Sequence, residues 1–211
     1  MDFGSGRHFL QIPGPTNVPD RVLRVLSRPT IDHRGPEFSA LAINVLEGCK
    51  RIYRSSGPVV IFPSSGSGAW EAALVNTLSP GDKVLMFETG HFATLWRDIA
   101  VRLGLDVDFV AGDWRHGVDP EVVGEKLSAD RNKQYKSVMV VHNETSTGVT
   151  SRIAEIRKAI DAAKHPALFM VDSISSLGSM DYRHDEWGGG CNRRVLPEGI
   201  DVAARTGAQR H

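Results

Sequence analysis

A loop rich in serine and glycine occupies residues 64–68, between a short apolar run and a segment with helical spacing. Backbone N–H groups and hydroxyls at the start of a helix attract an anion, usually a phosphate, because the helix dipole is positive there. The loop matches neither the P-loop, which needs Gly-Lys-Ser/Thr, nor the dinucleotide pattern G-x-G-x-x-G. It therefore indicates either a phosphate-binding loop or a flexible turn closed by a capping serine.

A carboxylate, Asp172, directly follows the apolar run at residues 167–171. The carboxyl end of a buried parallel strand points into the crevice where such sheets bind ligands. A carboxylate is costly there unless it has a cationic partner or a set of hydrogen-bond donors. The alternative is a cap for the turn marked by Ser173 and Ser175, but the position of Asp172 favours a functional role.

Two further features follow apolar strands. The polar segment at residues 142–148 follows one expected strand, and Phe92 follows another. Each has an ordinary explanation, loop capping for the segment and core packing for the phenyl ring. Because the carboxyl ends of parallel strands share one edge of a sheet, we expect these groups to converge with Asp172. Trp70, Trp96 and Trp114 are expected in the core or half-buried.

Periodicity predicts an α/β fold. Apolar residues recur at helical spacing in some segments and form unbroken runs in others, and the two kinds alternate. We expect helices at 36–52, 69–78, 92–103, 119–127 and 151–163, and strands at 59–62, 83–87, 107–110, 137–142 and 167–171. This alternation predicts a mostly parallel sheet covered by helices on both faces.

Three regions follow from composition. Residues 1–35 are rich in proline and glycine near their start and are expected to form an N-terminal arm. Residues 36–188 form a partial α/β domain. Residues 189–211 show no hydrophobic period and no lysine, and we expect a disordered tail.

The charge balance is neutral, with 25 acidic and 25 basic side chains. It gives no sign of a nucleic-acid or membrane partner, and no apolar run reaches the roughly 20 residues of a membrane helix. Two cysteines, Cys49 and Cys191, make no disulfide framework, so the cytoplasm is the expected location, with Cys49 as a buried small hydrophobe. The eight histidines lack metal-ligand spacing, so no metal is expected. No G-x-S-x-G elbow supports a serine hydrolase.

Five motifs in order resemble the class V aminotransferases, most closely the serine–glyoxylate and alanine–glyoxylate branch. They lie at residues 13–17, 32–38, 65–73, 142–148 and 171–173, and the resemblance runs from about residue 9 to residue 188. It implies the large domain of a type I pyridoxal-phosphate (PLP) transferase. The family also has a smaller C-terminal domain, absent here, and forms a homodimer.

The resemblance implies roles around the cofactor PLP. The residues implied to bind it are Ser65, Gly66 and Ser67 at the phosphate, Phe92 on the ring, Thr145 near the phenolic oxygen and Asp172 at the ring nitrogen. An aspartate that pairs with the protonated nitrogen keeps the ring an electron sink. The residues implied on the substrate side are Gly14, Thr16 and Asn17. The implied partners are a small amino acid and a 2-oxo acid.

One expected motif is missing. The family carries Ser-Gln-Lys-Gly shortly after the aspartate, and its lysine forms the Schiff base with PLP. This chain has no lysine after Lys164, so no catalytic residue is assigned. Codons for residues 189–206, read one base later, permit Val-Asp-Val-Thr-Val-Ala-Cys-Ser-Gln-Lys-Gly-Leu-Met-Leu-Pro-Pro-Gly-Leu. We therefore hypothesise that the tail is an out-of-frame translation, from a genuine frameshift or a sequencing error.

The function implied is amino transfer from serine or alanine to glyoxylate through PLP, with this chain inactive because the Schiff-base lysine is missing. One alternative is a non-catalytic truncated fragment that binds PLP weakly or not at all. Another is a different type I PLP enzyme, such as a cysteine desulfurase. The Trp70-Glu71 helix start and the segment 142–148 argue against that second alternative.

Overall fold

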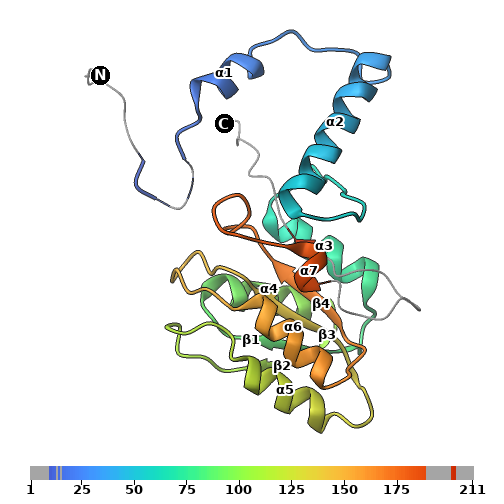
Figure 1. Ribbon diagram of the computed structural model, residues 1–211, viewed down its shortest axis with the longest axis vertical. Coiled ribbons are helices and arrows are strands. Elements are labelled where there is room, and N and C mark those ends of the chain that lie inside the picture. Colours follow the sequence, from blue (N-terminus) through green and yellow to red (C-terminus); the bar gives the residue numbers. More distant parts are fainter. Residues whose placement is uncertain (1–9, 13, 15, 189–200, 203–211) are drawn as a thin grey trace. The chain divides into compact units, whose positions relative to one another are not determined.

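The computed structural model describes residues 10–12, 14, 16–188 and 201–202, and the chain divides into two units (Figure 1). The first unit ends at Val45. It contains helix α1 (Asp20–Leu26) and the start of helix α2 (Pro36–Tyr53), which continues into the second unit. The sequence predicts α2 to within one residue at its end, whereas α1 was not predicted inside the arm.

The second unit, from Leu46 on, is built on a parallel sheet. Its strands lie in the order β2-β1-β3-β4-β5, and every pair is parallel. Their bounds are Lys83–Phe87 for β1, Asp106–Val110 for β2, Tyr135–Val141 for β3, Leu168–Asp172 for β4 and Asp201–Val202 for β5. Four of the five expected strands are thus confirmed, and so is the α/β fold class.

The remaining helices are α3 (Gly66–Thr77), α4 (His91–Arg102), α5 (Pro120–Ala129), α6 (Ile153–Ala162) and α7 (His184–Gly188). One helix, α3, precedes the first strand, and helices α4 to α7 each connect two successive strands, as expected for parallel crossovers. The start of α5 follows the predicted pattern, because Asp119 accepts a hydrogen bond from the N–H of Glu121 and Pro120 opens the helix. None of the described helices is long and apolar enough to cross a membrane.

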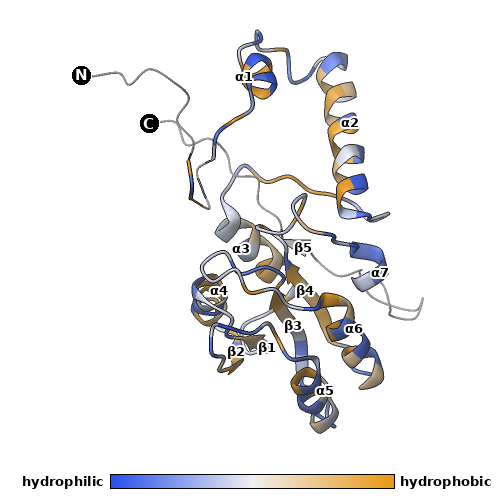
Figure 2. Cartoon of the chain, turned by 60° about the vertical axis from the view of Figure 1, so that its left-hand side comes forward, coloured by the Kyte–Doolittle hydropathy of each residue, from blue (hydrophilic) through white to orange (hydrophobic). Residues whose placement is uncertain are grey.

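Alternate strand residues build two cores, one on each face of the sheet. Leu85, Val138 and Phe169 pack toward α5 and α6. Their chain neighbours Val84, Met139 and Met170 pack toward α3 and α4. This is the period of two that a strand imposes. In Figure 2 the strands are coloured hydrophobic, whereas α5 and α6 carry both hydrophilic and hydrophobic residues, as helices with one covered face do.

Two expectations are wrong. Residues 59–62 form no strand, and Val60, Ile61 and Phe62 are 69%, 49% and 53% exposed. A strand needs a neighbour for its backbone hydrogen bonds, and none of the described strands pairs with this run. Trp114 is also exposed, although Trp70 and Trp96 are buried as expected.

The structure tests the expectations on the cysteines and the tail only in part. Cys49 is a free thiol on α2 and is half-buried. Cys191 and most of the segment 189–211 lie outside the described residues. Within that segment Asp201 and Val202 form β5, which pairs in parallel with the end of β4.

Candidate functional site

Asp172 ends strand β4 and is 3% exposed. Its Oδ2 accepts a hydrogen bond from Trp70 Nε1 at 3.1 Å, and its Oδ1 accepts one from the N–H of Ile174 at 2.8 Å. Burial raises the pKa of Asp172 to about 7, opposed by these two hydrogen bonds and assisted by the nearby Glu144 carboxylate. Among the described residues, no cation forms a salt bridge with Asp172. A positively charged group of a ligand could therefore compensate the charge of this carboxylate.

A second buried carboxylate, Glu144, follows β3 and caps helix α4. Its two oxygens accept from the N–H of Phe92 at 3.1 Å and of Ala93 at 3.0 Å. Its side chain lies against Gly90, where an added Cβ would come within 2.5 Å of the Glu144 Cγ, so only glycine fits there. Glu144 therefore fixes Phe92 at the edge of the sheet. The sequence predicts a polar cluster in this segment and carries no separate signal for Glu144.

Thr145 joins the loops after β3 and β4. Its hydroxyl is hydrogen-bonded to that of Ser175, three residues beyond Asp172. Both side chains are half-buried. The structure thus brings the three residues to the carboxyl edge of the sheet, as the sequence predicts. Asp172 ends β4, Thr145 lies in the loop after β3, and Phe92 lies in the first turn of α4, after β1.

The serine-rich loop lies at the start of α3. Ser65 is the residue before the helix, and its Oγ is 2.9 Å from that of Ser67. Gly68 approaches Ser64 so closely that a Cβ would lie 1.9 Å from the Ser64 Oγ. The loop lines a hollow of about 470 Å³, which Arg102 of α4 also lines. The Glu71 side chain lines the hollow too and opposes an anion, whereas the hydroxyls, the first turn of α3 and the Arg102 cation favour one.

The loop and Asp172 are linked through Trp70. This residue lies one turn into α3 and bridges 102 residues of sequence to reach the carboxylate. The sequence predicts Trp70 to be in the core or half-buried. The only local signal for a further role was its place one turn after the loop.

The predicted substrate-side residues belong to the first unit. Asn17 Oδ1 accepts a hydrogen bond from the N–H of Leu10 at 2.8 Å, and nothing lies within 4 Å of a Cβ built on Gly14. The roles of Gly14, Thr16 and Asn17 therefore stay predictions.

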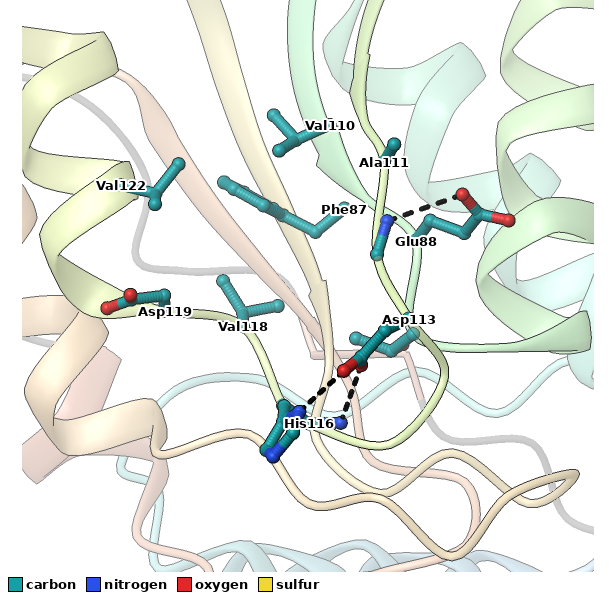
Figure 3. A pocket seen from close by; sticks show the side chains of 12 residues that line it. Phe87, Glu88, Val110, Ala111, Asp113, His116, Val118, Asp119 and Val122 are labelled. Carbon is teal, nitrogen blue, oxygen red and sulfur yellow. Dashed lines mark hydrogen bonds and ion pairs between the residues drawn. The ribbon is translucent and has the colours of Figure 1, made fainter.

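A separate hollow of about 210 Å³ opens beyond the ends of β1 and β2 (Figure 3). Phe87, Val110 and Val118 give it an apolar wall, and Asp113 is hydrogen-bonded to His116 at its rim. Hydrogen bonds from the N–H of Arg115 and from His116 lower the pKa of Asp113 to about 2. None of the predicted site residues lines this hollow. Within the described part of the chain, no group of three or more His, Cys, Asp or Glu residues could hold a metal ion.

The family model for "Aminotransferase class-V" matches residues 8–189. The chain therefore belongs to the class V aminotransferases, which are PLP-dependent transferases. The large-domain fold and the arrangement of the strand-end residues agree with that membership.

Similar curated proteins carry glyoxylate in their names. The chain is 49% identical to the serine–glyoxylate aminotransferase of Methylorubrum extorquens, over 93% of this chain and 51% of that protein. It is 45% identical to the Arabidopsis thaliana enzyme of the same name, over 95% of this chain and 52% of that enzyme. It is 48% identical to the L-aspartate–glyoxylate aminotransferase of Paracoccus denitrificans, over 90% of this chain and 50% of that enzyme. The chain thus spans about half the length of these relatives.

Solved structures agree on the fold. The ureidoglycine–glyoxylate aminotransferase of Bacillus subtilis superposes with a TM-score of 0.79 at 29% identity, over 89% of this chain and 47% of that one. The alanine–glyoxylate aminotransferase of Nostoc sp. superposes with a TM-score of 0.78 at 26% identity, over 89% of this chain and 49% of that one.

Proposed function

We propose that this chain is the cofactor-binding half of a transaminase that moves an amino group from serine or alanine to glyoxylate with PLP. The observation that carries the proposal is Asp172, a buried carboxylate at the carboxyl edge of the sheet that no described cation compensates. When bound, PLP supplies a protonated ring nitrogen and an electron sink, and this nitrogen is the partner that Asp172 lacks.

The other predicted residues fit the remaining parts of the cofactor. Ser65, Gly66 and Ser67 at the start of α3 suit its phosphate, because free N–H groups and hydroxyls gather there. Phe92 offers a half-buried aromatic face, and Glu144 holds its backbone. The Thr145 hydroxyl suits the phenolic oxygen. Together these side chains would orient the cofactor and exclude water from one side of it.

The names of the similar proteins support glyoxylate as the amino acceptor. Serine, aspartate, alanine and ureidoglycine appear as donors in the names of the five proteins given above, and glyoxylate is common to those five names. We infer that a 2-oxo acid of this size is the acceptor. Serine or alanine is our choice of donor, and the two serine–glyoxylate enzymes favour serine.

We further propose that this chain alone does not catalyse amino transfer. Its seven lysines are Lys50, Lys83, Lys126, Lys133, Lys136, Lys158 and Lys164. Lys83 and Lys136 lie at the amino ends of β1 and β3, and Lys126 of α5 pairs with Asp108. None ends a strand at the edge that carries Asp172. The chain therefore has no amine placed to bond the cofactor or to move a proton on the substrate, and we expect PLP to bind non-covalently.

Exposed apolar side chains of the first unit support a homodimer. Val22 and Leu26 of α1 are 41% and 69% exposed, and Leu41 of α2 is 50% exposed. Apolar surface of this kind is typical of a contact with another chain. We propose that a second copy covers it, in the cytoplasm, where free thiols such as Cys49 stay reduced.

Titration of the purified chain with PLP tests the cofactor assignment. We expect saturable binding in the wild type and binding at least about tenfold weaker in Asp172→Asn, since a charged hydrogen bond is lost. Asp113→Asn is the matched control, because its carboxylate lines the other hollow. After borohydride treatment, mass spectrometry should find no cofactor attached to the chain. Equal binding by Asp172→Asn would contradict the site, and a covalent adduct would contradict the missing-amine proposal.

A further inference from the structure

Two tryptophans stack in the core beside the candidate site, and they differ in one respect. The Trp70 and Trp96 rings lie 5.8 Å apart at an interplanar angle of 16°, and both are at most 2% exposed. Trp70 Nε1 donates to Asp172 Oδ2 at 3.1 Å. Trp96 Nε1 is buried and has no hydrogen-bond partner among the described residues. The chain thus contains one indole N–H directed at the carboxylate, and a neighbouring indole N–H that is not.

Packing alone does not account for the Trp70 contact. A phenyl ring at position 70 could also stack on Trp96 but has no donor, whereas the Trp70 indole stacks and donates to Asp172. The carboxylate is held at two points, by Trp70 on Oδ2 and by the N–H of Ile174 on Oδ1. Two donors on different oxygens fix the plane of the carboxylate and favour its charged form.

We propose that Trp70 is a positioning residue that holds the Asp172 carboxylate in the orientation required by the cationic ring nitrogen of the cofactor. This inference rests on the proposed function. Trp70 lies three residues after Ser67, so the two share one face of α3. The first turn of α3 lines the hollow that Arg102 also lines, and Trp70 in its second turn reaches Asp172. One rigid helix therefore sets the distance between the two charged ends of the ligand site.

Two variants and two ligands test the proposal in the full chain. Trp70→Phe and Trp96→Phe each remove an indole from the same stack, but only the first removes a donor to Asp172. The ligands are PLP and its 1-deaza analogue, in which C–H replaces the ring nitrogen. We expect Trp70→Phe to weaken PLP binding about tenfold and Trp96→Phe less than about twofold, since only a hydrogen bond to a charged group costs that much.

The deaza analogue separates positioning from packing. It presents no cation to Asp172, so we expect Trp70→Phe to bind it as the wild type does. Equal losses for PLP and the deaza analogue in Trp70→Phe would reduce Trp70 to a packing residue and overturn the proposal. Unchanged PLP binding in Trp70→Phe would overturn it as well.

A second measurement needs no cofactor. The infrared carboxyl band of Asp172, identified by its absence in Asp172→Asn, is followed against pH in the free chain. Loss of the indole donor should move the titration of Asp172 to higher pH in Trp70→Phe, but not in Trp96→Phe. If Asp172 titrates at the same pH in Trp70→Phe as in the wild type, the proposal is overturned, whether or not the variant binds PLP. If the wild type binds neither ligand, the proposed function fails, and the infrared result still decides whether Trp70 acts on Asp172.

Discussion

The buried position of Asp172 lowers the stability of the folded chain at neutral pH. Its pKa is about 7 in the folded chain, against an ordinary value of 3.8. Between these two values the unfolded chain has released the proton that the folded chain keeps, so stability falls as pH rises from about 4 to about 7. The shift corresponds to about 4 kcal/mol of lost stability at neutral pH, as an order of magnitude. A buried acid kept at such a cost is typical of a functional site.

Replacement of Asp172 by asparagine should therefore stabilise the free chain while it weakens PLP binding. We expect Asp172→Asn to unfold at higher urea than the wild type at pH 8, by a few kcal/mol in the free energy of unfolding, with the gain vanishing near pH 4. Asp113→Asn serves as control, because the pKa of the exposed Asp113 is lowered rather than raised and no such gain is expected. A less stable Asp172→Asn at pH 8 would show that the ionised carboxylate is already compensated.

At this scale the sequence predicts where the site residues lie but not what holds them. Asp172, Thr145 and Phe92 were predictable because each lies at, or within five residues after, the carboxyl end of an apolar strand. Their partners were not, since Trp70 lies 102 residues from Asp172 and Glu144 lies 52 residues from Phe92. Contacts at such separations depend on the packing of α3 and α4 against the sheet, which periodicity does not specify.

Among the elements, α4 depends on a cap supplied from outside the helix. The residue before it, Gly90, has no side chain to cap the first turn, and Glu144 accepts from the N–H groups of Phe92 and Ala93 instead. A negative charge at this end also favours the helix dipole. The loop after β3 thereby fixes the start of α4, and with it the aromatic ring that the cofactor is proposed to contact.

Glu144→Gln should destabilise the chain by about 2–3 kcal/mol, because an amide group replaces one acceptor oxygen by a donor that faces the helix N–H groups. Thermal unfolding should show this as a fall of several degrees in Tm. Ser146→Ala is a graded comparison, since it removes a hydroxyl that accepts from the N–H of His91 at 3.0 Å and donates to Glu144 at 2.7 Å but leaves the Glu144 hydrogen bonds to Phe92 and Ala93 in place. We expect it to lower Tm less than Glu144→Gln does. A Tm for Glu144→Gln equal to that of the wild type would contradict the capping role.

Strands β1 to β4, which have neighbours in the described sheet, were predicted correctly, whereas the apolar run without such a neighbour was not. The run at 83–87 coincides with β1 because its strand neighbours, β2 and β3, are also within the described chain. The run at 59–62 is equally apolar, yet it is exposed and unpaired among the described strands. Hydrophobic sequence predicts the tendency to form a strand, but a strand forms only where a partner backbone is present.

For the molecule as a whole, the chain spans about half the length of its curated relatives and has the residues proposed to bind the cofactor without the expected lysine. Two cores on the faces of one parallel sheet give this half a substantial interior of its own. We therefore expect it to fold and to bind a ligand without catalysing transfer. The segment that follows Gly188 decides whether catalysis can be recovered.

We propose that removal of one base directly after codon 188 restores the catalytic segment. The codons of residues 189–206 then permit a peptide with Ser-Gln-Lys-Gly, whose lysine codon straddles those of Glu198 and Gly199. The restored product should attach PLP in a borohydride-stable form and show serine- or alanine-dependent amino transfer to glyoxylate, because an amine is then available to bond the cofactor and move the proton. The same product with that lysine codon changed to alanine should do neither. Resequenced DNA whose bases do not spell this peptide, or a restored product without the adduct, would show that the tail is not an out-of-frame reading of the missing segment.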